Sequence, residues 1–360
     1  MHTNNKYIFP TASLITGNID KVTKGFIYRS MLFLFTLLLI SSVQAKQAFK
    51  QSADSLLQGE TMAIAYSGFR VGQHPDRGNG AINPSDAEIL EDLRILLSHD
   101  LDLIRLYDSG ENSATTLKMI KQHKLPIKVL LGIWLDAEVS NHEGCAWLDL
   151  PIPAQELFDN KIKNMLEIQR GIKLSEKYPN IVVAVNVGNE ALVDWNDHMV
   201  TLNSIIGYVR EVKQSISQPV TVADNYEWWI RDGATLAAEV DFIGVHTYPA
   251  WENQTIDEAL AYTIENIENV HKALPNKPIV ILEGGWATTG KEFAQQANEE
   301  NQKRYFNEIM QWSKASNTTF FFFEAFDEPW KGNPTNLKGA EKHWGLFNVD
   351  RTPKKVMMPK

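Results

Sequence analysis

The segment Ile181-Val182-Val183-Ala184-Val185-Asn186-Val187, followed by Gly188-Asn189-Glu190, decides the fold. Six of its first seven residues are apolar, which is typical of a strand buried on both faces of a parallel sheet. A second run, 278–282, has the same character and also ends in a glutamate, Glu283. Because parallel strands need helices to cover their faces, the two runs predict an α/β protein.

The same pattern extends outward from these two runs. Short apolar runs predict eight strands, at 62–66, 103–106, 127–133, 181–187, 220–223, 242–245, 278–282 and 319–323. Amphipathic stretches predict helices at 84–98 and 114–123, with Asn83 and Ser113 as N-caps, at 156–177, 199–216, 256–273 and 291–313, and at most a short helix at 231–239.

Eight strand–helix units indicate a single (β/α)8 TIM barrel, a fold that typically takes about 250 residues. An open, doubly wound sheet is the structural alternative. Its dinucleotide-binding version needs a glycine-rich loop after the first strand. Tyr66-Ser67-Gly68-Phe69 stands there instead, which disfavours that version.

The first 45 residues have the pattern of a signal peptide. Lys24 and Arg29 precede an apolar run at 31–40, and small residues follow at 41–45. An apolar core of about ten residues is too short to cross a bilayer. We therefore expect a cleaved signal peptide at 1–45, a lead-in at 46–60, a catalytic barrel at 61–352 and a tail at 353–360. An extended n-region and a mis-assigned start at Met1 both remain open.

Composition excludes several classes of partner and cofactor. A formal charge of −9 over 360 residues disfavours nucleic acid and anionic membranes. Cys145 is the single cysteine, which excludes an intramolecular disulfide. The sequence has neither a His-Glu-x-x-His motif nor a Gly-x-Ser-x-Gly elbow. We expect an exported monomer, periplasmic or extracellular, with no metal, no cofactor and no membrane anchor after cleavage.

The two strand-end glutamates suggest chemistry on a glycosidic bond. Such cleavage needs one carboxylic acid to protonate the leaving oxygen and a second carboxylate to attack the anomeric carbon. We expect Glu190 to be the acid/base, beside Asn189, and Glu283 to be the nucleophile, oriented by Tyr248. The alternative is that each glutamate only begins a loop and pairs with a neighbouring cation.

Other polar and aromatic residues follow the predicted strands, where a barrel places its active site. The expected substrate-binding residues are Asn189, Tyr107, Tyr248, Trp286, Glu324 and Trp330. Core packing is the alternative for Tyr107, core or loop packing for Trp286 and Trp330, and a structural network around Lys331 for Glu324.

These strand-end motifs resemble glycoside hydrolase family 17, the β-1,3-glucanase family. The segments that carry the resemblance are Asn189-Glu190, Arg105-Leu106-Tyr107, Tyr248-Pro249, Glu283-Gly284-Gly285-Trp286, 323–331 and 343–347. The resemblance runs from about Ala63 to Val349. It implies a retaining barrel enzyme with Glu190 as acid/base and Glu283 as nucleophile.

The resemblance is closer to bacterial members than to plant members. Plant enzymes usually have Glu-Ser/Thr-Gly-Trp-Pro in place of Glu283-Gly284-Gly285-Trp286, and often Asn in place of His246. The expected function is retaining hydrolysis of β-1,3-glucosidic bonds in a laminarin-like β-glucan, as in a glucan endo-1,3-β-glucosidase. A β-1,3-glucanosyltransferase and a non-catalytic glucan-binding protein are the alternatives, and endo or exo action stays open.

Overall fold

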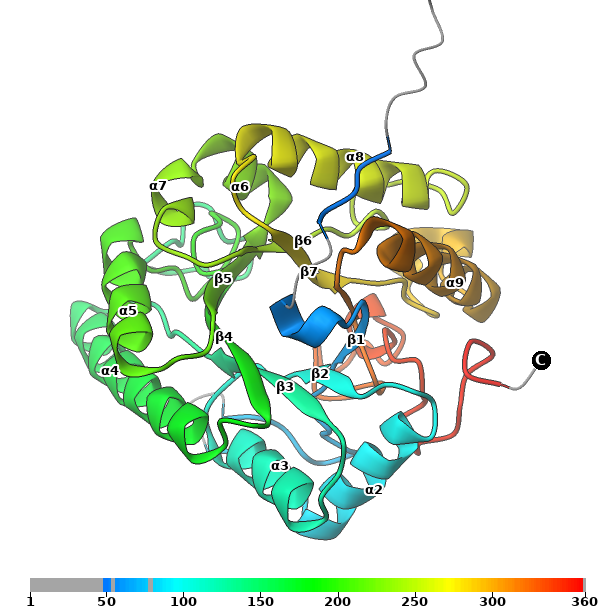
Figure 1. Ribbon diagram of the computed structural model, residues 1–360, viewed down its shortest axis with the longest axis horizontal. Coiled ribbons are helices and arrows are strands. Elements are labelled where there is room, and N and C mark those ends of the chain that lie inside the picture. Colours follow the sequence, from blue (N-terminus) through cyan, green and yellow to red (C-terminus); the bar gives the residue numbers. More distant parts are fainter. Residues whose placement is uncertain (1–47, 53–55, 77–79, 359–360) are drawn as a thin grey trace, which may run out of the picture. The chain divides into compact units, whose positions relative to one another are not determined.

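The computed structural model describes residues 48–52, 56–76 and 80–358. In this part of the chain, eight strands form a closed barrel in the order β1 to β8, and each strand is parallel to its neighbours. Helices surround the ring of strands (Figure 1). The predicted TIM barrel is confirmed. The predicted signal peptide lies outside the described residues.

The strands are β1 (Met62–Ala65), β2 (Leu103–Arg105), β3 (Lys128–Ile133), β4 (Val182–Asn189), β5 (Val220–Asn225), β6 (Ile243–His246), β7 (Ile279–Gly284) and β8 (Phe320–Phe322). The helices are α2 (Asp86–Leu97), α3 (Glu111–Gln122), α4 (Ala154–Lys177), α5 (Leu202–Ser215), α6 (Tyr226–Arg231), α7 (Ala234–Ala237), α8 (Ala259–Ala273) and α9 (Glu299–Ser316). Short 3-10 helices are η1 (Leu56–Gly59), η2 (Lys291–Gln296) and η3 (Ala340–Lys342). None of the described helices is long and apolar enough to cross a membrane.

Both predicted helix N-caps are wrong. Helix α2 is capped by Ser85 instead of Asn83, because the Ser85 side chain accepts from the Glu88 amide and Glu88 bonds back to the Ser85 amide. Helix α3 begins three residues earlier than predicted, after Gly110. Ser113 therefore lies inside its first turn.

The predicted helix at 291–313 is two separate elements, η2 and α9. Asn298 separates them with an extended backbone (φ −161°, ψ 162°), and its side chain caps α9 by accepting from the amide of Asn301. Amphipathic spacing continues through this break, so periodicity alone did not reveal it.

The inside of the barrel is filled with apolar side chains. Ala63, Leu103, Leu130 and Phe321 belong to one buried cluster inside the strands, and Leu57 of η1 joins it. Figure 1 shows η1 in the middle of the ring of strands. Because the interior is packed, chemistry is confined to the mouth formed by the strands' C-terminal ends.

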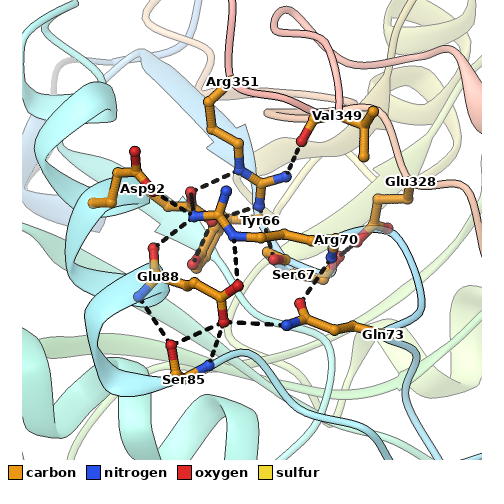
Figure 2. Close-up of polar contacts among 12 residues, drawn as sticks. Tyr66, Ser67, Arg70, Gln73, Ser85, Glu88, Asp92, Glu328, Val349 and Arg351 are labelled. Carbon is orange, nitrogen blue, oxygen red and sulfur yellow. Dashed lines mark hydrogen bonds and ion pairs between the residues drawn. The ribbon is translucent and has the colours of Figure 1, made fainter.

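A buried ion-pair network ties the end of the described chain to the loop after β1 (Figure 2). Arg351 bonds to both oxygens of Asp92, at 2.8 and 2.7 Å, and to the carbonyl of Gly68. Arg70 also pairs with Asp92, at 2.9 Å. Ser67, in the same loop, donates to Glu328 beyond β8. The network thus fixes one edge of the barrel mouth.

We expect Arg351→Met to lower the free energy of unfolding by about 3 kcal/mol, near the low end for breaking a buried ion pair. Asp92 has no exposed surface and would keep only Arg70 as a counter-charge. Chemical denaturation measures the change. Arg210→Met, which breaks a surface pair with Glu239, is the control and should change stability little. Equal losses in the two variants would contradict the role given to Arg351.

Candidate active site

Four strands bring ionisable side chains together at the mouth of the barrel. Arg105 ends β2, Glu190 follows β4, His246 ends β6 and Glu283 lies near the end of β7. Carboxylate oxygens of both glutamates and a ring nitrogen of His246 all lie within 4.8 Å of one another. The sequence prediction that Glu190 and Glu283 meet is therefore confirmed by their geometry.

Glu283 is 6% exposed and accepts two strong hydrogen bonds. Arg105 Nη1 lies 2.8 Å from its Oε1, and the Tyr248 hydroxyl lies 2.7 Å from its Oε2. The predicted bond from Tyr248 is confirmed. Burial alone would raise the pKa of Glu283. The positive charges of His246, when protonated, and of Arg105 lower this pKa, as do the hydrogen bonds from the tyrosines, and the net shift is downward. The arrangement stabilises an ionised carboxylate.

Two tyrosines cover this carboxylate. Burial, followed by the charge of Glu283, raises the pKa of both Tyr107 and Tyr248 well above the usual value. Both therefore keep their hydroxyl protons, and the Tyr248 hydroxyl donates to Glu283. The Arg105 guanidinium lies 4.6 Å from the centre of the Tyr107 ring, a cation–π contact. Tyr107 thus faces the barrel mouth instead of the core.

Glu190 has an unusual backbone conformation directly after β4. Its φ of 48° lies in the left-handed region, which costs a residue with a Cβ about 1 kcal/mol. Two contacts hold it: its amide donates to Ala223 at 2.8 Å, and its carbonyl accepts from Asn196 Nδ2 at 2.9 Å. The turn aims the side chain into the mouth, where it is 22% exposed.

His246 lies between the two glutamates and has no exposed surface. Its Nδ1 is 2.9 Å from Glu190 Oε1, and its Nε2 is 3.6 Å from Glu283 Oε1. Three such side chains can in principle bind a metal ion. Here the ring turns a different nitrogen to each carboxylate, and Arg105 already supplies a cation, so the arrangement does not suit one shared ion.

Asn189 and Glu324, both predicted to bind substrate, are held by cations. Asn189 Oδ1 accepts from Arg105 Nη2 at 2.5 Å. Glu324 follows β8 and lies 2.5 Å from Lys331 Nζ, which also pairs with Glu328 at 2.8 Å. Burial raises the pKa of Glu324 well above its usual value despite Lys331, with Glu328 adding to the rise. Contact of either residue with a sugar stays a prediction.

The prediction that Trp286 stacks on a sugar is wrong. Its side chain is 1% exposed, its indole N–H donates to the carbonyl of Gln296, and its ring packs against Tyr305 of α9. The residue follows β7, but its side chain turns outward under α9 and away from the mouth. Trp330 is half-buried, with its ring edge-on to Phe69, and its stacking on sugar stays a prediction.

Sequence reasoning missed how Arg105 and His246 act in the site. Arg105 entered the prediction as part of a motif, whereas in the structure its guanidinium donates to Glu283 and Asn189. His246 was noted only as a replacement for Asn. A charged or ionisable side chain at the end of an apolar strand was the available signal for both residues.

Comparison with known proteins identifies the family to which the barrel is similar. The model of the BtgE/BtgC glycoside hydrolase domain matches residues 63–345. A glucan 1,3-beta-glucosidase of Arthroderma benhamiae is 25% identical over 74% of this chain and 83% of its own length. A putative glucan endo-1,3-beta-glucosidase, btgC, of Aspergillus niger is 26% identical over 75% of this chain. The matched part is only 40% of the length of that relative.

Two solved structures share the barrel. An endo-laminarinase from Formosa Hel1_33_131 is 28% identical, with a TM-score of 0.70 over 82% of this chain and 85% of its own. A beta-1,3-glucanosyltransferase from Rhizomucor miehei, solved as an active-site mutant with laminaritriose, is 23% identical, with a TM-score of 0.63 over 83% of this chain and 97% of its own. The second likeness supports the fold alone.

Proposed function

The chain belongs to the BtgE/BtgC glycoside hydrolase domain family, and from that premise we propose that it hydrolyses β-1,3-glucosidic bonds of a β-glucan by a retaining double displacement. Glu283 is the nucleophile and Glu190 the acid/base. The names of the relatives and of the endo-laminarinase support the substrate class. The barrel mouth supports the chemistry.

The spacing of the two carboxylates carries the proposal. Oxygens of Glu190 and Glu283 lie within 4.8 Å of each other. Retaining glycosidases hold their carboxyl groups about 5–5.5 Å apart, whereas inverting enzymes need about 6.5–9.5 Å to admit a water. The separation therefore favours direct attack by one carboxylate on the sugar.

The surroundings divide the two roles. Arg105 and Tyr248 donate to Glu283, which keeps it ionised for attack on the anomeric carbon. Glu190 gives its proton to the leaving glycosidic oxygen as the covalent glycosyl ester forms on Glu283. Glu190 then takes a proton from a water molecule, which attacks the ester and frees Glu283.

Transfer to a sugar is the second candidate function. The same ester can react with a sugar hydroxyl in place of water, with Glu190 again acting as the base. The glucan-binding surface would then favour an acceptor sugar over water. The shared barrel of the Rhizomucor miehei enzyme is compatible with this outcome but carries the fold alone.

The location of the protein is part of the proposal. The leader-like segment at 1–45 favours a cleaved signal peptide and export to the periplasm or the medium. The barrel at 61–352 would then act as a monomer on laminarin-like glucan outside the cytoplasm. Detection of residues 1–45 still attached to the exported protein would overturn this part of the proposal.

A time course on a linear β-1,3-glucan oligosaccharide tests the proposed reaction. Products are separated by size, and NMR follows the configuration of the first anomer released. Shorter products released first as the β-anomer support retaining hydrolysis. Products longer than the substrate support transfer. Unchanged substrate with measurable binding would support a non-catalytic glucan-binding protein and overturn the proposal.

We expect the acidic limb of kcat/KM to lie below pH 4.5, the usual glutamate value. Glu283 has to be ionised to attack, so activity falls as the pH drops through its lowered pKa. Tyr248→Phe removes a donor to the ionised form, and we expect the limb to rise by about one pH unit. Tyr178→Phe, at the opposite end of the barrel, is the control. An unmoved limb in Tyr248→Phe would contradict this assignment.

A further inference from the structure

Resting on the proposed function, we propose that His246 is a positioning residue that determines which oxygen of Glu190 carries the catalytic proton. The ring donates from Nδ1 to Oε1 of Glu190, so the acidic proton of Glu190 is confined to Oε2. Arg105 fixes the ring in this tautomer.

Arg105 determines whether Nε2 of the His246 ring carries a hydrogen or a lone pair. A guanidinium has only donors and stays charged in proteins. Nη1 of Arg105 lies 3.2 Å from His246 Nε2. The two hydrogens of Nη1 are donated to the Leu282 carbonyl at 2.9 Å and to Glu283 Oε1 at 2.8 Å, so Nε2 faces the positive charge of the guanidinium. A hydrogen on Nε2 would point at a cation that cannot accept it, whereas a lone pair on Nε2 is attracted to that charge. The neutral ring therefore carries its hydrogen on Nδ1.

The other tautomer has no good partner. A hydrogen on Nε2 would have to reach Glu283 Oε1, at 3.6 Å, which is too long for a hydrogen bond. That oxygen already accepts from Arg105 Nη1 at 2.8 Å. One guanidinium thus donates directly to Glu283 and, by fixing the His246 tautomer, orients Glu190.

The Nδ1 hydrogen then determines which oxygen of Glu190 carries the acidic proton. Nδ1 lies 2.9 Å from Glu190 Oε1, so Oε1 is an acceptor in both protonation states of the carboxyl group. The other oxygen, Oε2, has a contact of 3.5 Å with Asn196 Nδ2, at the limit of hydrogen bonding. When Glu190 is the acid, its proton is therefore on Oε2.

Burial makes this role indirect. His246 has no exposed surface, whereas the Glu190 side chain is 22% exposed. A glucan in the mouth can contact Glu190 but not the ring. His246 therefore acts on the reaction through Glu190, and its loss should affect the protonation of the leaving group more than attack by Glu283.

Substitutions at His246 test this role through the leaving group. We expect His246→Leu to lower kcat/KM on a β-1,3-glucan oligosaccharide by roughly 10–100-fold, the usual effect of losing an orienting partner. An aryl glycoside with a dinitrophenolate leaving group needs no proton and should lose much less. His246→Asn, which places an amide N–H near the Nδ1 position, should recover most activity. His246→Gln, which places it near Nε2, should not.

A direct measurement of the tautomer tests the inference without activity. Nitrogen-15 NMR of labelled histidine, with the His246→Asn spectrum used to identify the signal, should show a protonated Nδ1 and an unprotonated Nε2.

His123→Asn, at the exposed end of α3, is the control for the kinetic comparison and should leave the kinetics on both substrates unchanged. If the wild-type protein cleaved no β-1,3-glucan, the proposed function would fail while the NMR measurement still decided the tautomer.

Two results would overturn the inference. One is a ring with its hydrogen on Nε2. The other is an equal loss on both substrates in a folded His246→Leu protein, with His246→Asn no better than His246→Leu, because that pattern indicates only a structural role.

Discussion

Glu283→Ala is expected to lower turnover of β-1,3-glucan by about 10⁴-fold or more, as loss of a catalytic nucleophile does elsewhere. The vacated space lies beside Arg105 and Tyr248, whose donors would face a cavity in place of a carboxylate. Azide is small and anionic, so it can enter this cavity and attack an activated aryl β-glycoside. The product should be the α-glycosyl azide, because one displacement inverts the anomeric carbon.

Glu300→Gln is the matched control for this prediction. Glu300 lies on α9, is 69% exposed and pairs with Lys355 at the surface. Its kinetics should match the wild type with and without azide. Formation of a β-glycosyl azide by Glu283→Ala, or near wild-type cleavage of glucan, would show that another residue is the nucleophile.

The fold could be predicted because fully apolar strands carry their own signal. Each predicted strand agrees with the structure within two residues at both ends. The main differences are extensions at the C-terminal ends of β4, β5 and β7, which end in Asn189, Asn225 and Gly284. Polar residues and glycine interrupt the apolar run there, so the pattern ends before the strand does.

The closeness of Glu190, Glu283 and Tyr248 could be predicted because all three lie at or just after the ends of clear strands. The pairing of Arg105 with Glu283 could not, since β2 and β7 are not neighbours in the barrel and the two residues are 178 positions apart. Only the curvature of the closed barrel brings them together across the mouth. Apolar periodicity carries no information on such a distant pair.

Trp286 shows a second limit of sequence reasoning. Position after a strand indicates closeness to the mouth, but not the direction of the side chain. In the structure a hydrogen bond to Gln296 and packing on Tyr305 turn the indole beneath α9. The N-cap predicted for α2 was wrong for a similar reason. Several residues before α2 could cap it, and the reciprocal hydrogen bonds of Ser85 and Glu88 decided between them.

Glu190→Ala should have the second-largest effect, and its size should depend on the substrate. On β-1,3-glucan we expect kcat/KM to fall by roughly 10²–10⁴-fold, the contribution of general acid catalysis. On a dinitrophenyl glycoside the first step should be nearly intact, because the leaving group needs no proton. The second step should be slow, since no base activates water, and the glycosyl ester on Glu283 should accumulate as a burst of dinitrophenolate.

Azide distinguishes the two glutamates by stereochemistry. In Glu190→Ala it attacks the ester already formed on Glu283, from the face where water normally attacks. Two displacements then give the β-glycosyl azide, whereas Glu283→Ala gives the α-azide by one. Glu190→Gln keeps the side-chain size near His246 and separates loss of the proton from loss of packing. An α-azide from Glu190→Ala, or equal losses on glucan and dinitrophenyl glycoside, would mean that Glu190 is not the acid/base.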